Sequence, residues 1–128
     1  MVEPSHDGSE GINVLIAEVP ALLASVVRQT VNEEGDMTVV DEVDSENELS
    51  NALQHRIDVV ITASQANELG PQFRALLFGP RSLPIVMISL DGSRIDVYGR
   101  SITRGGGIAS LTALIREAVA GARVRIGG

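Results

Sequence analysis

INVLIAEVPALLASVVRQTVNEEG (residues 12–35) combines a predicted strand with a predicted helix. Residues 12–18 form a nearly continuous apolar run, which is typical of a strand covered on both faces. From Leu22 to Val31 the apolar residues recur at helical spacing, and Gly35 is expected to end the helix. A buried strand followed at once by a helix is the repeating unit of parallel sheets, so this stretch predicts an α/β fold.

The rest of the chain repeats this alternation. Further predicted strands are the apolar runs at residues 37–43, 57–63, 83–90 and 95–99. Further predicted helices lie at residues 45–53, 65–78 and 108–119. Ser45 and Glu48 fit a capping box for the first of these helices, whereas Gly70-Pro71 should delay or break the start of the second.

The connection between the fourth and fifth strands is too short for a helix. Only LDGSR (90–94) separates them, whereas a parallel crossover takes about a dozen residues or more. Asp91-Gly92 is a hairpin signal, so we expect a tight turn and an antiparallel fifth strand. The helix that would otherwise follow the fourth strand is therefore predicted to be missing.

Composition limits the function classes. The chain has 128 residues, a formal net charge of −7 and no cysteine, which fits one globular domain without disulfides, thiolate metal sites or cysteine nucleophiles. The ten basic residues, all arginines, are not clustered, which argues against direct binding of nucleic acid. No apolar run approaches the ~20 residues needed to cross a membrane, and the polar N-terminus is no signal peptide, so we expect a cytoplasmic protein.

The order of elements and several short motifs resemble the CheY-like receiver domain of two-component response regulators of the LuxR/NarL type. The stretches that carry the resemblance are VLIAEVPALLASVVR (14–28), DVVITAS (58–64), PIVMIS (84–89) and IREAVAG (115–121). The resemblance implies a three-layer flavodoxin-like fold with sheet order 2-1-3-4-5. It covers about residues 12–122, between an expected disordered leader (1–11) and a tail or linker start (123–128).

The resemblance also implies a phosphotransfer site, which this sequence matches poorly. Receivers hold magnesium with two acids after the first strand and an aspartate at the end of the third, and that aspartate accepts the phosphoryl group. Here Glu18 stands at the first acid position, Val19 replaces the second, and Ala63 falls at the acceptor position. Ser89 matches the hydroxyl that binds phosphoryl oxygens, and Arg100 is nearest to the family's lysine. With the antiparallel fifth strand, however, Arg100 should lie far from Ser89.

One carboxylate does not hold magnesium tightly, and alanine accepts no phosphoryl group, so we expect no phosphotransfer, enzymatic activity, metal or cofactor. The hypothesis is a degenerate receiver that signals through protein contact as the regulatory part of a transcription regulator. One alternative is a phospho-accepting receiver that uses Thr62 or Ser64. Another is a small-ligand or nucleotide-binding module, since open α/β sheets bind ligands at the carboxyl ends of their strands.

The missing helix predicts where a partner binds. Its absence should uncover apolar sheet surface, and an antiparallel edge strand can pair with another chain. Both arguments favour a contact, as a homodimer or with another protein, at the fifth strand. The interface candidates are Arg94, Ile95, Asp96, Val97 and Tyr98.

Two other features have simpler interpretations than a binding site. Arg104-Gly105-Gly106-Gly107 precedes a helix and has the composition of an anion-binding nest, but a flexible loop is the favoured interpretation because no P-loop or dinucleotide motif is present. His55 lies near a helix end, where a cation favours the helix dipole.

Overall fold

A computed structural model describes residues 11–64, 71–78, 83–99, 102–107 and 110–127. The expected leader therefore lies almost entirely outside the described residues, as does Arg100. The strands are β2 (Ile12–Ala17), β3 (Met37–Val43), β4 (Val59–Ser64), β5 (Ile85–Ser89), β6 (Arg94–Tyr98) and β7 (Ile102–Gly106). The helices are α2 (Ala21–Asn32), α3 (Glu46–Ala52), α4 (Pro71–Phe78) and α5 (Leu111–Gly127).

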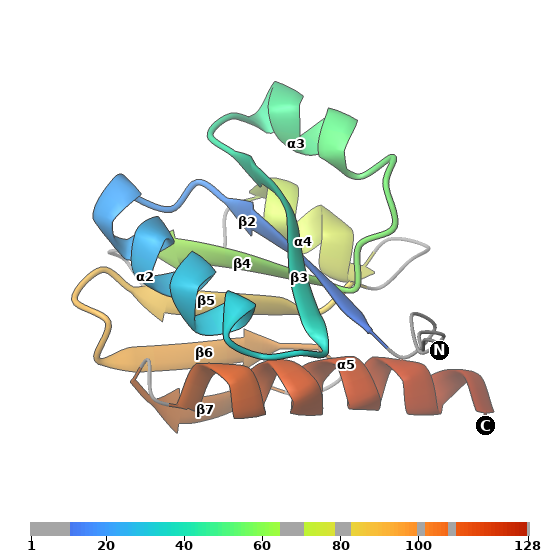
Figure 1. Ribbon diagram of the computed structural model, residues 1–128. Helices are drawn as coiled ribbons and strands as arrows, with labels where there is room; N and C mark the ends of the chain where they lie inside the picture. Colours follow the sequence, from blue (N-terminus) through green and yellow to red (C-terminus); the bar gives the residue numbers. More distant parts are fainter. Residues whose placement is uncertain (1–10, 65–70, 79–82, 100–101, 108–109, 128) are drawn as a thin grey trace, which may run out of the picture.

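The strands form one sheet in the order β3-β2-β4-β5-β6-β7 (Figure 1). β2 pairs in parallel with β3 and β4, and β4 pairs in parallel with β5, whereas β6 is antiparallel to both β5 and β7. The first five of these strands have the expected order 2-1-3-4-5. The fold is therefore the predicted three-layer α/β architecture of CheY-like receivers, with an antiparallel fifth strand.

Alternating side chains assign the strands to two apolar clusters. In β2, Val14 and Ile16 face α2 and α5, while Leu15 and Ala17 face α3 and α4. The edge strand β3 is exposed at Thr38 and from Val40 to Glu42, whereas β2, β4 and β5 are buried on both faces because a helix layer covers each face (Figure 1). This explains why their sequences are nearly continuous apolar runs.

Several helix boundaries follow the local signals in the sequence. Ser45 Oγ accepts a hydrogen bond from the Glu48 backbone N–H at 3.2 Å, and the Glu48 carboxylate accepts one from the Asp44 N–H at 2.9 Å, which stabilises the start of α3. α4 begins at Pro71, a favoured residue for the first helical position. α2 ends at Asn32, before Gly35.

β5 and β6 are joined by a tight turn over residues 90–93. The Gly92 N–H donates to the Ser89 carbonyl at 2.8 Å, and Gly92 adopts a φ of 75°, which glycine reaches without steric cost. The predicted hairpin is thus confirmed, and it leaves no room for a helix between these strands.

One expectation for the C-terminal part is wrong. Arg104, Gly105 and Gly106, interpreted as part of a flexible loop, belong to β7, which pairs with β6 over five residues. Glycine is unfavourable in strands unless pairing with a neighbouring strand stabilises them, so this segment carries no strand signal of its own. α5 continues to Gly127, beyond the helix predicted at residues 108–119.

The face left without a helix is nevertheless buried. Met87 of β5 and Asp96 of β6 lie side by side on the α3/α4 side and are each only 3% exposed. Phe73 of α4, Leu83 and Tyr98 belong to the apolar cluster on this side. Among the described residues, the exposed large hydrophobic side chains are Leu22, Val26, Val40 and Leu90, and none of them is in β5 or β6. The prediction of uncovered sheet surface at these strands is therefore wrong.

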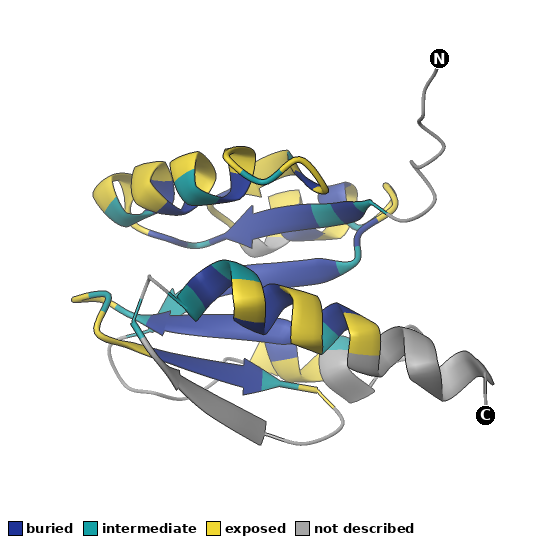
Figure 2. Cartoon of the chain, turned by 60° about the horizontal axis from the view of Figure 1, so that its bottom comes forward, coloured by how far each residue is buried: buried dark blue, intermediate teal, exposed yellow. Residues whose placement is uncertain are grey.

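Figure 2 shows that β2, β4 and β5 are almost wholly buried, whereas the outward side of α2 is exposed. Leu22 on that side is 86% exposed. No helix in the described part of the chain is both long and apolar enough to span a membrane.

Candidate functional site

The carboxyl ends of β2, β4 and β5 lie together at one end of the parallel strands, where open α/β folds bind ligands. Glu18 follows β2 and has a φ of 57°, a left-handed conformation that costs a residue other than glycine about 1–2 kcal/mol. Its N–H donates to the Val43 carbonyl at 2.8 Å, and its carboxylate accepts a hydrogen bond from Gln72 Nε2 at 2.9 Å. Two neighbouring elements, β3 and α4, therefore hold Glu18 in place.

The end of β4 supplies the residues at the predicted acceptor position. Ala63 is half-buried, and its methyl group packs against the apolar cluster under α2 and α5. Thr62 is only 3% exposed and faces the α3/α4 side, while Ser64 is half-buried and pairs with Ser89 of β5. Val19, at the second acid position, is buried in the same cluster as Ala63.

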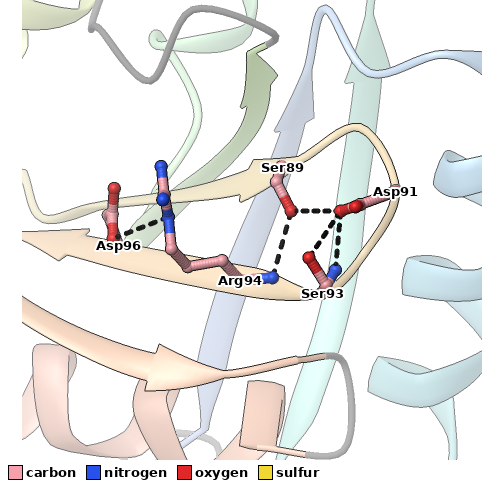
Figure 3. A network of polar contacts seen from close by, with 5 residues as sticks. All are labelled: Ser89, Asp91, Ser93, Arg94 and Asp96. Atoms are coloured by element: carbon pink, nitrogen blue, oxygen red, sulfur yellow. Dashed lines mark hydrogen bonds and ion pairs between the residues drawn. The ribbon is translucent and has the colours of Figure 1, made fainter.

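The Ser89 hydroxyl forms hydrogen bonds to residues of the β5–β6 hairpin (Figure 3). Its hydroxyl donates to Asp91 Oδ1 at 2.8 Å and accepts from the Arg94 N–H at 3.0 Å. The same carboxylate oxygen accepts from the Ser93 hydroxyl at 2.7 Å and the Ser93 N–H at 3.0 Å. The Ser89 hydroxyl thus joins the two strands of the hairpin.

These contacts favour the charged form of Asp91. Hydrogen bonds from the Ser93 side chain, the Ser93 backbone N–H and the Ser89 hydroxyl lower the pKa of Asp91 to about 2. Asp91 is fully exposed, and its carboxylate closes the turn as an ordinary hairpin residue does.

The site does not fit the magnesium ion that the receiver resemblance implies. The carboxylate of Glu18 is hydrogen-bonded to Gln72, and the positions of the two other family acids hold Val19 and Ala63. A hard divalent cation needs several oxygen ligands. Within the described ranges, no group of three or more histidine, cysteine, aspartate or glutamate side chains is arranged to hold a metal.

The five interface candidates lie in β6, which is an interior strand. β5 pairs with one side of β6 and β7 with the other, so the β6 backbone has no open edge, and the edge-strand prediction for this segment is wrong. Ile95 and Val97 are buried against α5, and Tyr98 is half-buried on the opposite side. Arg94 is exposed, with its Nε 3.8 Å from Oδ1 of buried Asp96.

Two of the described arginines form ion pairs with acids. Arg28 of α2 binds Glu42 of β3 with Nε 2.5 Å from Oε2, and Arg116 of α5 binds both Glu34 and Asp36. The Arg28–Glu42 pair borders a shallow depression of about 280 Å³ between α2 and β3. Glu42 and Asp41 make this depression acidic, which is unsuitable for a phosphate group.

Sequence reasoning missed Gln72, because its role depends on where α4 lies relative to β2. It identified Asp91 only as a turn residue, and the hydrogen bond to Ser89 was not predicted. A serine two residues before Asp91 and another two residues after it was the available signal, since aspartate in turns bonds to nearby hydroxyl and amide groups.

Comparisons with known proteins support the fold. No protein-family model and no curated protein matches the sequence. Among solved structures, the chain is similar to the response regulator RcsB of Salmonella typhimurium, described in terms of its conformational dynamism for DNA interaction. That match has 20% identity and a TM-score of 0.53, and it covers 66% of this chain and 45% of that one.

Isolated receiver domains of RcsB are similar to the same extent. The domain from Salmonella enterica serovar Typhimurium, with the phosphomimetic BeF3−, matches at 21% identity and a TM-score of 0.51, covering 62% of each chain. The non-phosphorylated domain from Escherichia coli matches at 23% identity and a TM-score of 0.51, covering 61% of this chain and 64% of that one. The matched region thus spans less than two thirds of each RcsB chain. At these identities the likeness establishes the fold.

Proposed function

We propose that this chain is a receiver-like regulatory domain that signals through protein contact, without accepting phosphate and without catalysis or a cofactor. The observation that carries the proposal is the end of β4, where Ala63 presents a half-buried methyl group packed against the core at the position of the family's acceptor. Glu18, which stands at the first of the family's acid positions, is bound by Gln72. Ser89 is held in the hairpin turn.

The neighbouring hydroxyl residues are poor substitutes for the acceptor. Thr62 is buried and faces the side of the sheet opposite to Ala63. Ser64 is half-buried, but an alcohol is a weak nucleophile without a base or metal to activate it, and the carboxylate of Glu18 is bound by Gln72. The alternative of a phospho-accepting receiver is therefore disfavoured.

The context of the domain is proposed by analogy. RcsB is described as a response regulator that forms dimers bound to DNA, and a similar role makes this chain the regulatory module of a cytoplasmic transcription regulator. Nucleic acid would then be bound elsewhere in such a protein, since Arg28 and Arg116 are paired with acids. The partner is a second copy or another protein.

Treatment with acetyl phosphate and magnesium, followed by intact-mass measurement and light scattering, tests the proposal. We expect no added phosphoryl group and an unchanged molar mass. A phosphorylated protein, or a change of oligomeric state on treatment, would contradict it. An active receiver treated in parallel verifies the reagent.

A matched variant tests the reason for the inactivity. Ala63→Asp combined with Val19→Asp supplies the missing carboxylates beside Glu18. We therefore expect the double variant to gain a phosphoryl group under the same treatment, whereas the wild type does not. Circular dichroism checks that the buried Val19→Asp change leaves the domain folded.

A small-ligand module is the second candidate, and the conformation of Glu18 favours it. Strained backbone conformations concentrate at binding and catalytic sites, and Glu18 lies where the strand order reverses between β2 and β4. A thermal-shift screen of nucleotides tests this candidate, because a ligand bound to the folded state raises the melting temperature. The expected result for a contact module is no shift; a shift abolished by Gln72→Ala would support the ligand module.

A further inference from the structure

We infer that β7 is a docking strand for a second copy of this chain, through antiparallel pairing of two β7 edges about a two-fold axis. The inference rests on the proposed contact function and names the surface that performs it. β7 is the last strand of the sheet, and no described strand pairs with its outer side. Its inner side pairs with β6 over five consecutive residues without a register shift.

The hydrogen bonds of the hairpin show which backbone groups of β6 point to β7. Successive residues of a strand direct their N–H and C=O groups alternately to the two neighbours. The Arg94 N–H donates to the Ser89 hydroxyl on the β5 side. The backbone N–H and C=O groups of Arg94, and of every second residue after it, therefore point towards β5. Those of Ile95 and Val97 point towards β7.

The outward groups of β7 follow from its register with β6. Ile95 pairs with Gly105, and Val97 pairs with Thr103. Gly105 and Thr103 thus exchange hydrogen bonds with β6. The alternation leaves the N–H and C=O groups of Ile102, Arg104 and Gly106 pointing away from the sheet. An edge strand with such a row of backbone donors and acceptors is a template for another strand.

The other edge of the sheet is protected. β3 carries a bulge at Val40, because Val14 pairs with Val39 and the next residue of β2 pairs with Asp41. Bulges interrupt the regular hydrogen-bonding row and twist an edge away from other strands. Asp41 and Glu42 on β3 are also exposed, so two such edges would repel each other. The pairing of β7 with β6 contains no such bulge.

Charge and symmetry favour a second copy as the occupant. The chain has a net charge of −7, so copies repel each other except where a surface lacks acids, and ITRGG contains none. Antiparallel pairing of two identical strands is self-complementary and closes as a dimer. Pairing of β7 with β3 of another copy would leave a free edge strand at each end of the assembly, so that further copies could add. It would also place the Val40 bulge in the contact.

Antiparallel pairing of the two β7 strands in a register centred on Thr103 uses the backbone groups that point away from the sheet. It pairs Ile102 of each copy with Arg104 of the other, so that all the bonds come from residues that face outward. It also avoids placing the two Arg104 residues directly opposite each other. A contact of one short strand buries less than the ~1,200 Å² typical of stable complexes, so the expected dimer is weak and reversible.

Two variants at one position test the pairing. Arg104→Pro removes the outward N–H but no hydrogen bond to β6, and edge strands tolerate proline at such positions. Arg104→Ala removes the side chain and keeps the N–H. By sedimentation velocity on the full chain over a concentration series, we expect Arg104→Pro to weaken dimerisation about tenfold or more. Arg104→Ala should leave the dissociation constant near that of the wild type.

Hydrogen exchange on the wild type gives a second measurement that needs no variant. The amides of Ile102, Arg104 and Gly106 should exchange more slowly as protein concentration rises, while exposed amides of β3 should not change. A wild type that stays monomeric at millimolar concentration, or a dimer unaffected by Arg104→Pro, would overturn the inference. Either result leaves the proposed function open to contact with another protein, whereas phosphoryl transfer to the wild type would overturn that function itself.

Discussion

The parallel and antiparallel halves of the sheet are built from different connections. β3, β2, β4 and β5 are parallel, and α2, α3 and α4 lie between them in the sequence. β5, β6 and β7 are antiparallel, and no helix separates them in the sequence. Both halves nevertheless share one apolar cluster under α2 and α5. The length of a connection thus goes with the direction of the strand that follows it, while the core continues across the change.

The largest expected effect tests whether the two halves unfold together. Ile61 of β4 and Ile95 of β6 are both fully buried in the shared cluster. Changing either one to alanine should lower the free energy of unfolding by about 2–5 kcal/mol, because each change leaves a cavity. Urea unfolding followed by circular dichroism checks this, with exposed Leu90→Ala as a control expected within about 0.5 kcal/mol of the wild type.

A small loss for Ile95→Ala beside a large loss for Ile61→Ala would mean that the antiparallel half is an appendage. Unfolding in two separate transitions would lead to the same conclusion.

A smaller effect distinguishes a turn of the antiparallel half from a turn of the parallel half. Gly92, in the β5–β6 turn, has a φ of 75°, so Gly92→Ala should cost about 1–2 kcal/mol. Gly35, between α2 and β3, has an ordinary φ and nothing within 4 Å of an added Cβ. Gly35→Ala should therefore be neutral or stabilise the fold by about 0.4–1 kcal/mol. Melting temperatures compare the two variants, and equal shifts would contradict the role of Gly92.

The smallest effect concerns pH and the same β5–β6 turn. Hydrogen bonds lower the pKa of Asp91 to about 2, below the value of about 3.9 for aspartate in an unfolded chain. The contribution of the carboxylate is thus fully present above pH ~4 and is lost as pH falls towards ~2. The difference in unfolding midpoint between wild type and Asp91→Asn should shrink over this range in urea titrations. A difference that does not depend on pH would contradict this account.

The sequence was informative where local signals agree with tertiary structure. Continuous apolar runs predicted the buried parallel strands, and the short link at Asp91-Gly92 predicted an antiparallel β6. The capping pair Ser45 and Glu48 was also visible. Each of these features depends on residues that are neighbours in the sequence.

Features that depend on distant contacts were missed. β7 forms from ITRGG, a poor strand sequence, because it completes the pairing of β6. The burial of Met87 and Asp96 depends on how other segments cover the sheet, which no periodicity reveals. For the candidate site, sequence indicated the positions of Glu18, Ala63 and Ser89. It did not indicate that Gln72 binds the first or that Asp91 holds the last.

The β5–β6–β7 meander also bears on the order of folding. Its strands pair with their immediate neighbours in the sequence, as Ile88 does with Ile95, whereas β2 pairs with β4 only after the intervening helices and β3 have been spanned. Closing a short loop costs less chain entropy than closing a long one, and local contacts form faster. We therefore expect the meander to assemble early and to present β5 as a template on which β4, and then β2 and β3, are added.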